Sequence, residues 1–288
     1  MSRENASVAL AGIDAGYVCG LTWVPTEVLL AIAQPAGIQS PAEALVSIAS
    51  AAGADFAFVP SGEPWAIEAV ELLTTADIAA VWTISGVLGR VADEVGWTRA
   101  LRLSAAEPGQ LAITLAEALN GALVDARVGL LAGADALVVA DDLAGATGPL
   151  VSPDFALDAL LPCYHHIALA VATEGIPTIF HSDGDIRSLM PALARAGFSA
   201  IHLAGIAEEG WATSYAAARL EGLAVLGGIE AMSVVHGVRR SGERAGRSSL
   251  ADGLLVCDDG GITSAEEIVA LTAALDVARE VYAAGSGD

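Results

Sequence analysis

The stretch "GIPTIFHSDGDIRSLMPALARAGFSAIHLAG" (175–205) decides the fold prediction, because it holds two apolar runs with a helical segment between them. The runs 177–182 and 200–205 are continuously apolar rather than alternating, which is typical of parallel strands covered on both faces. Residues 185–197 carry apolar side chains at three- and four-residue spacing and end in glycine, a common signal at a helix C-terminus. The stretch therefore predicts a strand–helix–strand unit.

The same alternation continues along most of the chain. Further strands are expected at 55–60, 79–85, 136–141, 223–228 and 253–258, and further helices at 41–53, 108–134 and 264–282. A chain of 288 residues with this pattern is typical of an α/β fold, the (β/α)8 TIM barrel, which needs about 250 residues. Seven strands are evident, so the eighth is expected at "VALAG" (8–12) or elsewhere within 1–50. A doubly wound open sheet is the alternative, but no G-x-G-x-x-G turn follows a first strand.

Composition limits the class of protein. Thirteen basic residues stand against 35 acidic ones, and the net charge of −22 repels nucleic acid. All thirteen are arginine, and the absence of lysine excludes Schiff-base and P-loop chemistry. The cysteines Cys19, Cys163 and Cys257 are few and far apart, which suits a reducing compartment. No segment predicts a signal peptide or a membrane span, so we expect a cytoplasmic protein. We expect one domain, 1–288, with 1–50 as a helical or irregular N-terminal cap.

Titratable side chains follow several predicted strands at the point where each strand ends. They are Asp141, Asp142, His181, Asp183, His202, Glu230, Cys257, Asp258 and Asp259. In a barrel the carboxyl ends of the strands meet at one rim, where catalytic groups gather. We therefore expect these side chains to surround one cavity.

Most of these residues also have a purely structural interpretation. Asp185 suits the N-cap of the following helix, where a carboxylate accepts hydrogen bonds from free backbone N–H groups. Asp141 and Asp142 are common turn residues. His181 could be a core histidine with satisfied hydrogen bonds, and Cys257 a small buried apolar residue.

Four stretches together resemble the uroporphyrinogen decarboxylase superfamily, which includes the methylcobalamin:coenzyme M methyltransferases. They are "GADALVVADDLAGATGPLVSPDFALDALLPCYHHI" (133–167), the stretch 175–205, "LAVLGGIEA" (223–231) and, more loosely, "LLVCDDGGITSAEEIVALTAAL" (254–275). The resemblance covers about half of the chain in detail and implies a (β/α)8 barrel with its site at the strand ends.

The methyltransferase branch implies a zinc ion held by a His-x-Cys pair and a later cysteine. The zinc lowers the pKa of a thiol, which then accepts a methyl group from a corrinoid. The matching motif here is His181-Ser182-Asp183, and Gly260 stands in the place of the later cysteine. Because a carboxylate oxygen is an accepted zinc ligand, our hypothesis is a Zn²⁺ site formed by His181, Asp183 and Cys257.

The resemblance thus predicts an enzyme of one-carbon transfer that acts on a small-molecule substrate. Asp142, Asp183, Glu230 and His202 are the predicted catalytic groups, which move protons or orient the substrate. A separate partner protein would carry the corrinoid, because no D-x-H-x-x-G corrinoid-binding motif occurs in the chain. The resemblance also implies a homodimer.

Two alternatives remain open. One is a decarboxylase that needs no cofactor; that branch binds its tetrapyrrole with an arginine-rich N-terminal segment, whereas Arg3 is the only arginine before Arg90 here. The other is a barrel that binds a ligand, or a partner corrinoid protein, without catalysing a reaction.

Overall fold

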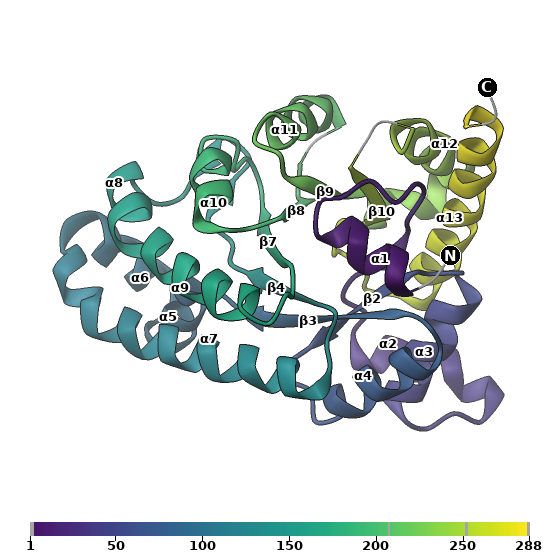
Figure 1. Cartoon of the computed structure of the whole chain (residues 1–288), viewed down its shortest axis with the longest axis horizontal. Helices are drawn as coiled ribbons and strands as arrows, with labels where there is room; N and C mark the ends of the chain where they lie inside the picture. Colours follow the sequence, from purple (N-terminus) through teal and green to yellow (C-terminus); the bar gives the residue numbers. More distant parts are fainter. Residues whose placement is uncertain (1–2, 207, 251–252, 287–288) are drawn as a thin grey trace.

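A closed parallel barrel forms the centre of the computed structural model, which describes residues 3–206, 208–250 and 253–286 (Figure 1). Its strands follow the order β1-β2-β3-β4-β7-β8-β9-β10. They are β1 (Gly20–Leu21), β2 (Phe56–Pro60), β3 (Ala79–Ser85), β4 (Ala136–Ala140), β7 (Thr178–Asp183), β8 (Ala200–Ala204), β9 (Ala224–Ile229) and β10 (Leu254–Asp258). A parallel bridge between Cys19 and Val256 joins the first strand to the last. The predicted (β/α)8 barrel is confirmed.

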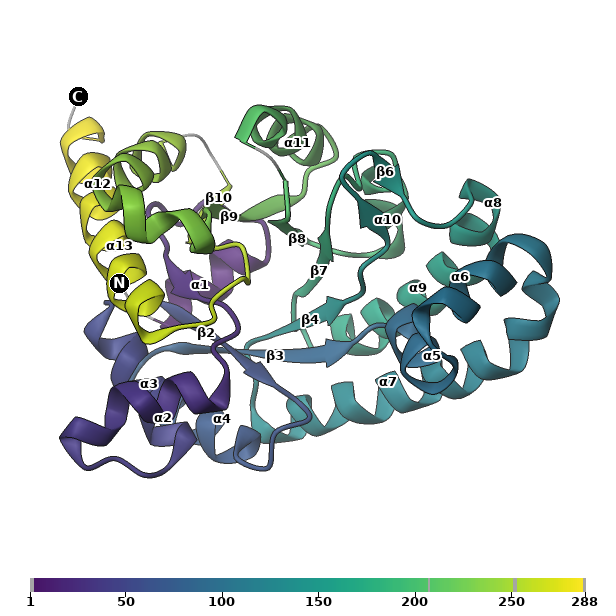
Figure 2. The same cartoon turned by 180° about the vertical axis from the view of Figure 1, so that it is seen from behind.

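Helices surround the barrel. They are α1 (Arg3–Leu10), α2 (Thr26–Ala33), α3 (Pro41–Ala51), α4 (Ala66–Thr75), α5 (Val87–Val95), α6 (Trp97–Ala106), α7 (Ala112–Ala132), α8 (Pro153–Phe155), α9 (Leu161–Ala172), α10 (Met190–Ala196), α11 (Glu208–Leu220), α12 (Ala231–Ser248) and α13 (Ala265–Gly285). The 3-10 helices η1 (Gln34–Ala36) and η2 (Pro108–Leu111), the π-helix η3 (Ala156–Leu160) and the hairpin strands β5 (Ala144–Gly145) and β6 (Gly148–Pro149) complete the set. Figures 1 and 2 show α12 and α13 side by side against one end of the sheet.

Strand alternation divides the core into two parts. On β7, Ile179 belongs to the cluster inside the barrel, whereas Phe180 belongs to the layer between the strands and the helices. Since successive side chains of a strand point to opposite faces, His181 and Asp183 share the inward face of Ile179. The titratable residues of β7 therefore face the upper part of the barrel.

The N-terminal segment supplies the eighth strand, but not at the position proposed first. The segment "VALAG" (8–12) is not a strand, because α1 runs through Leu10. Ala6 and Leu10 join the interior cluster, and Leu10 O accepts a hydrogen bond from Ser199 Oγ at 2.9 Å, so α1 closes the amino-terminal end of the barrel. The strand is Gly20–Leu21, within the second range considered.

The helix expected at 185–197 begins five residues later, at Met190. Asp185 is not its N-cap, because its carboxylate accepts hydrogen bonds from the backbone and the guanidinium of Arg187 instead. Gly184 adopts φ +82°, and a Cβ there would lie 2.6 Å from Gly145 O. The chain after β7 therefore turns tightly against the β5–β6 hairpin before the helix starts.

The helical stretch Pro153–Ala172 is long and apolar enough, by length and composition, to cross a membrane. In this structure Phe155, Tyr164 and Ile167 are buried in the layer between the strands and the helices, and the Tyr164 ring lies 5.2 Å from the Phe180 ring. We therefore assign the stretch to the helical layer of the barrel.

Candidate active site

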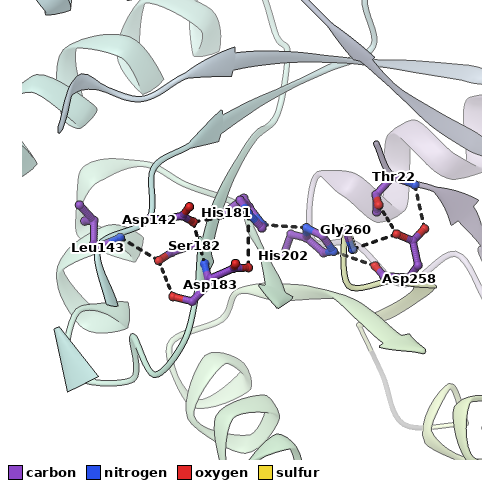
Figure 3. A network of polar contacts seen from close by, with 9 residues as sticks. All are labelled: Thr22, Asp142, Leu143, His181, Ser182, Asp183, His202, Asp258 and Gly260. Carbon is purple, nitrogen blue, oxygen red and sulfur yellow. Dashed lines mark hydrogen bonds and ion pairs between the residues drawn. The ribbon is translucent and has the colours of Figure 1, made fainter. Parts of the chain in front are cut away.

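Two histidines on neighbouring strands form a continuous chain of hydrogen bonds (Figure 3). His181 on β7 and His202 on β8 are in register, so their side chains leave the sheet on the same face. Their Nδ1 atoms lie 2.9 Å apart, and His202 Nε2 lies 2.9 Å from Asp258 O. Both rings are buried. His202 therefore contacts His181 and not the open cavity.

These two hydrogen bonds fix the tautomer of both imidazole rings. A carbonyl oxygen has no proton, so His202 Nε2–H donates to Asp258 O, and the Nδ1 of a neutral His202 accepts from His181 Nδ1–H. Burial lowers the pKa of both histidines, well below the usual value for His181, so both are neutral at pH 7. His181 Nε2 consequently carries a lone pair.

Two carboxylates face this lone pair. His181 Nε2 lies 3.8 Å from Asp142 Oδ1 and 3.9 Å from Asp183 Oδ1, which is too long for a hydrogen bond. Asp142 Oδ1 accepts the backbone N–H of Asp183 at 3.0 Å, and this bond ties the end of β7 to the turn after β4. Burial first, and then the charge of Asp142, raises the pKa of Asp183. Both carboxylates remain more than half exposed toward solvent.

This group fits a divalent cation. One donor atom from each of Asp142, His181 and Asp183 lies within 4.8 Å of the other two. Protein ligands bind such cations at roughly 2.0–2.2 Å, so a small inward movement would bring all three atoms into contact with one ion. Among the residues that the structure describes, no arginine forms an ion pair with either carboxylate. One nitrogen and two oxygens form a harder donor set than a cysteine site and accept Zn²⁺ as well as Mn²⁺ or Fe²⁺.

Cys257, the third ligand predicted from the sequence, is not part of this group. Its side chain is fully buried in the interior cluster, one register position below the rim. Burial first, and then the charges of Asp258 and Asp259, raises the pKa of its thiol well above the usual value. Asp142 stands where the sequence hypothesis put the thiol. Gly260 brings no donor either: it has φ +87°, and a Cβ there would lie 3.0 Å from the Trp23 ring.

Asp258, whose backbone oxygen accepts the hydrogen bond from His202, is fixed by hydrogen bonds to its own side chain. The buried Asp258 carboxylate accepts hydrogen bonds from the backbone N–H and the hydroxyl of Thr22 and from Gly260 N–H at 2.9 Å. Next along the chain from Thr22, the Trp23 ring lies 4.6 Å from the His181 ring, edge to face. The sequence prediction missed Thr22 and Trp23, because they follow a strand of only two residues.

Asp141 and Asp142 have different roles although they are adjacent. The Asp141 carboxylate accepts hydrogen bonds from Leu88 N–H and Gly89 N–H, both at 2.8 Å, and from the Tyr164 hydroxyl at 2.6 Å. It therefore binds the N-terminus of α5, where a negative charge is favourable, and burial raises its pKa to about 6. Asp141 is structural, whereas the carboxylate of Asp142 is half exposed and faces His181.

Glu230 lies across a cavity from Asp183, one of the three residues of the candidate metal group (Asp142, His181 and Asp183). A cavity of about 330 Å³ is lined by Asp183, Glu230, Asp259, Gly260 and Met232 among others. It adjoins a cavity of about 440 Å³ between β8, β9, α11 and α12, which shares Glu230 and Asp259. The structure thus brings Asp142, His181, Asp183 and Glu230 to one rim, with His202 beneath it.

The fold and this polar rim define the chain as a (β/α)8 barrel with a candidate site at the carboxyl ends of its strands. The family model described as uroporphyrinogen decarboxylase (URO-D) matches residues 76–253, more than half of the chain. The chain belongs to the URO-D family. A search of curated proteins gives no match.

Solved structures with the same fold have different activities. A methyltransferase from Methanosarcina mazei is 17% identical with a TM-score of 0.71, and the match covers 96% of this chain and 98% of that one. A D-allulose 3-epimerase from Methylomonas sp. is 12% identical, with a TM-score of 0.55 and coverage of 92% and 98%. An archaeal fructose-1,6-bisphosphate aldolase, whose catalytic Lys is covalently bound to the carbinolamine intermediate, is 11% identical, with a TM-score of 0.51 and coverage of 97% and 99%. This chain has no lysine, so it shares the fold with that aldolase but has no counterpart of its catalytic Lys.

Proposed function

We propose that this URO-D family protein is a methyl-transferring enzyme whose site at Asp142, His181 and Asp183 binds a divalent cation. The observation that carries the proposal is the hydrogen-bonded chain from Asp258 O through His202, which leaves the lone pair of His181 Nε2 facing two carboxylates. Histidines that bind metals commonly donate their other N–H to a fixed acceptor in this way. The similarity to a structure named as a methyltransferase supports the choice of reaction.

The residues of the chain divide the work between holding the cation and orienting the substrate. His181 Nε2 and the carboxylates of Asp142 and Asp183 would hold the ion, Zn²⁺ in the first instance, and their exposed side leaves room for a substrate atom. A bound cation of this kind lowers the pKa of a coordinated thiol or hydroxyl and so makes it a better methyl acceptor. Glu230, on the other side of the hollow, would orient the acceptor or take its proton. His202 acts as a positioning residue through its bond to His181.

The methyl donor in this proposal is a corrinoid carried by a partner protein, and the acceptor is a small molecule bound in the hollow. Decarboxylation of a polycarboxylate fits the rim less well. Among the described residues, Asp183, Glu230 and Asp259 line the two cavities together with one arginine, Arg244, so several substrate carboxylates would meet mainly like charge.

The test is demethylation of free methylcobalamin in the presence of small thiols, followed by its visible spectrum. Protein stripped with a chelator should be inactive and should recover activity with Zn²⁺ or Mn²⁺. Asp183→Asn should lower the rate by about 100-fold or more, because it removes a ligand charge. Asp158→Asn, which removes an exposed carboxylate on η3, is the matched control. Equal rates with and without chelator, or no demethylation with any thiol, would contradict the proposal.

A further inference from the structure

The larger cavity extends away from the candidate metal group toward α11 and α12, which lie near β8 and β9 in Figures 1 and 2. Its volume of about 440 Å³ is enough for a small organic molecule. On one wall the rings of Trp211 and Tyr215 lie 5.5 Å apart and nearly parallel, with 13° between their planes. Leu203, Ile206 and Ile229 add apolar surface. Aromatic and apolar side chains therefore make up much of the cavity lining.

The charged residues that line this cavity are mainly acidic. Glu230 and Asp259 lie on its rim, and Arg244 lies on the α12 side, where its Nη2 donates to Gly228 O at 3.4 Å. The pKa of Asp259 is raised to about 6, by burial first and also by the charges of Asp258 and Glu230, so the carboxylate is ionised at pH 7. Among the lining residues that the structure describes, two carboxylates and one guanidinium leave one net negative charge.

The candidate metal group does not cancel this charge. In the proposed function, a divalent cation balances the two carboxylates of Asp142 and Asp183. Glu230 and Asp259 then remain as the negative charges that face the aromatic wall. An anionic ligand would be repelled by these two carboxylates, whereas a neutral ligand would gain no electrostatic attraction from them.

We propose that this cavity binds a monovalent organic cation, an alkylammonium or quaternary ammonium group, with its methyl groups against Trp211 and Tyr215 and its charge toward Glu230 and Asp259. Aromatic faces attract such cations, and quaternary ammonium groups are a common ligand of aromatic pockets that also hold acidic residues. The inference deepens the proposed function by naming the substrate class, and it rests on that proposal for the placement of the substrate in the hollow that adjoins this cavity.

Three probes of nearly the same shape and different charge test the inference. They are choline, its neutral isostere 3,3-dimethyl-1-butanol, and the anion 3,3-dimethylbutanoate. Isothermal titration at pH 7.5 should show choline binding at least about tenfold tighter than the neutral isostere, and the anion weakest of the three. Choline binding should weaken as salt is raised, because part of it is electrostatic. Equal affinity for choline and the alcohol, tighter binding of the anion, or no binding of choline at millimolar concentration would overturn the inference.

Variants locate the binding. Glu230→Gln should weaken choline binding by about fivefold or more and leave binding of the alcohol unchanged, while Glu221→Gln, an exposed carboxylate outside the cavity, should change neither. Trp211→Phe should retain most of the choline affinity and Trp211→Leu should lose it, because only the first keeps a π face. Full choline affinity in both Trp211→Leu and Glu230→Gln would place the ligand elsewhere and refute the assignment.

The same titrations separate this inference from the proposed function. Choline binding is measured without any methyl transfer, in chelator-stripped and in metal-loaded protein. Choline binding in a protein that binds no metal at His181 would refute the metal site and leave the cation cavity standing. Metal binding at His181 with no preference for choline over the alcohol would refute the cation cavity and leave the metal site standing.

Discussion

Replacing His202 with leucine should weaken metal binding at a site that His202 does not touch. His202 receives the Nδ1–H of His181 and donates to Asp258 O, and both bonds are 2.9 Å long. Leucine fills the buried volume but can neither donate nor accept. The Nδ1–H of His181 then has no acceptor, and its Nε2 is no longer held as the lone-pair nitrogen.

The magnitude follows from these two bonds. Loss of the residue that orients a metal-binding histidine usually costs about 10- to 100-fold in metal affinity, or about 1.4–2.8 kcal/mol. The variant also leaves two buried polar groups, His181 Nδ1–H and Asp258 O, without partners, at about 1–3 kcal/mol each. We therefore expect the free energy of unfolding to fall by roughly 2–6 kcal/mol as well.

A second variant separates orientation from stability. In His202→Gln the amide nitrogen can donate to Asp258 O and the amide oxygen can accept from His181 Nδ1–H, so the direction of the chain is kept. We expect this variant to recover most of the metal affinity. His166→Leu, at an exposed histidine on α9, is the matched control and should behave as the unmodified chain.

The assay is calorimetric titration of chelator-stripped protein with Zn²⁺ and Mn²⁺, with circular dichroism to confirm that each variant is folded. ¹⁵N spectra of the imidazoles add a direct readout, because they report which nitrogen of His181 carries the proton. Folded His202→Leu protein that binds both ions as tightly as the unmodified chain would refute the reasoning. So would a proton on His181 Nε2 in the unmodified, metal-free protein.

Three further predictions follow from the same contacts. Asp141→Ala should lower the free energy of unfolding by roughly 2–4 kcal/mol in urea denaturation, because two N–H groups of α5 and the Tyr164 hydroxyl lose their acceptor; a loss below about 1 kcal/mol would contradict this. In the folded chain, burial first raises the pKa of Asp259 to about 6, above its ordinary value near 3.9. The unfolded chain therefore releases this proton at lower pH than the folded chain does. As the pH rises from about 4 to about 6, Asp259 should lower the free energy of unfolding by roughly 1–2 kcal/mol. Urea denaturation across that range should show a smaller fall in Asp259→Asn, and equal falls would refute the assignment. Cys257→Ser should keep its metal affinity within about threefold by calorimetry, because the thiol lies inside the barrel; a loss of tenfold or more would return the thiol to the ligand set.

The repeating strands and helices of this barrel could be predicted from the sequence because each leaves a local pattern. The seven continuous apolar runs are all strands, and the segment 41–53 is helical over Pro41–Ala51. β1 could not be found in this way, because two residues are too few for any periodicity. The late start of α10 depends on the contact of Gly184 with the β5–β6 hairpin, which is a tertiary contact that local spacing does not encode.

The candidate site could be predicted in part, because its residues follow strands that the sequence reveals. Residues at the ends of parallel strands meet at one rim, and this rule placed Asp142, His181, Asp183 and Glu230 together. It could not decide which side chains turn inward below the rim. Cys257 lies on the inward face but deeper in the barrel, so counting residues along the chain named a third ligand that is not in the group that the structure brings together.

The most direct test of the metal site is an anomalous difference map from crystals grown with Zn²⁺ and measured on both sides of the zinc absorption edge. The account predicts a peak about 2.0–2.2 Å from His181 Nε2 and from one oxygen each of Asp142 and Asp183. A fully occupied peak bound by Cys257 instead, or no peak beside His181 at saturating Zn²⁺, would contradict it.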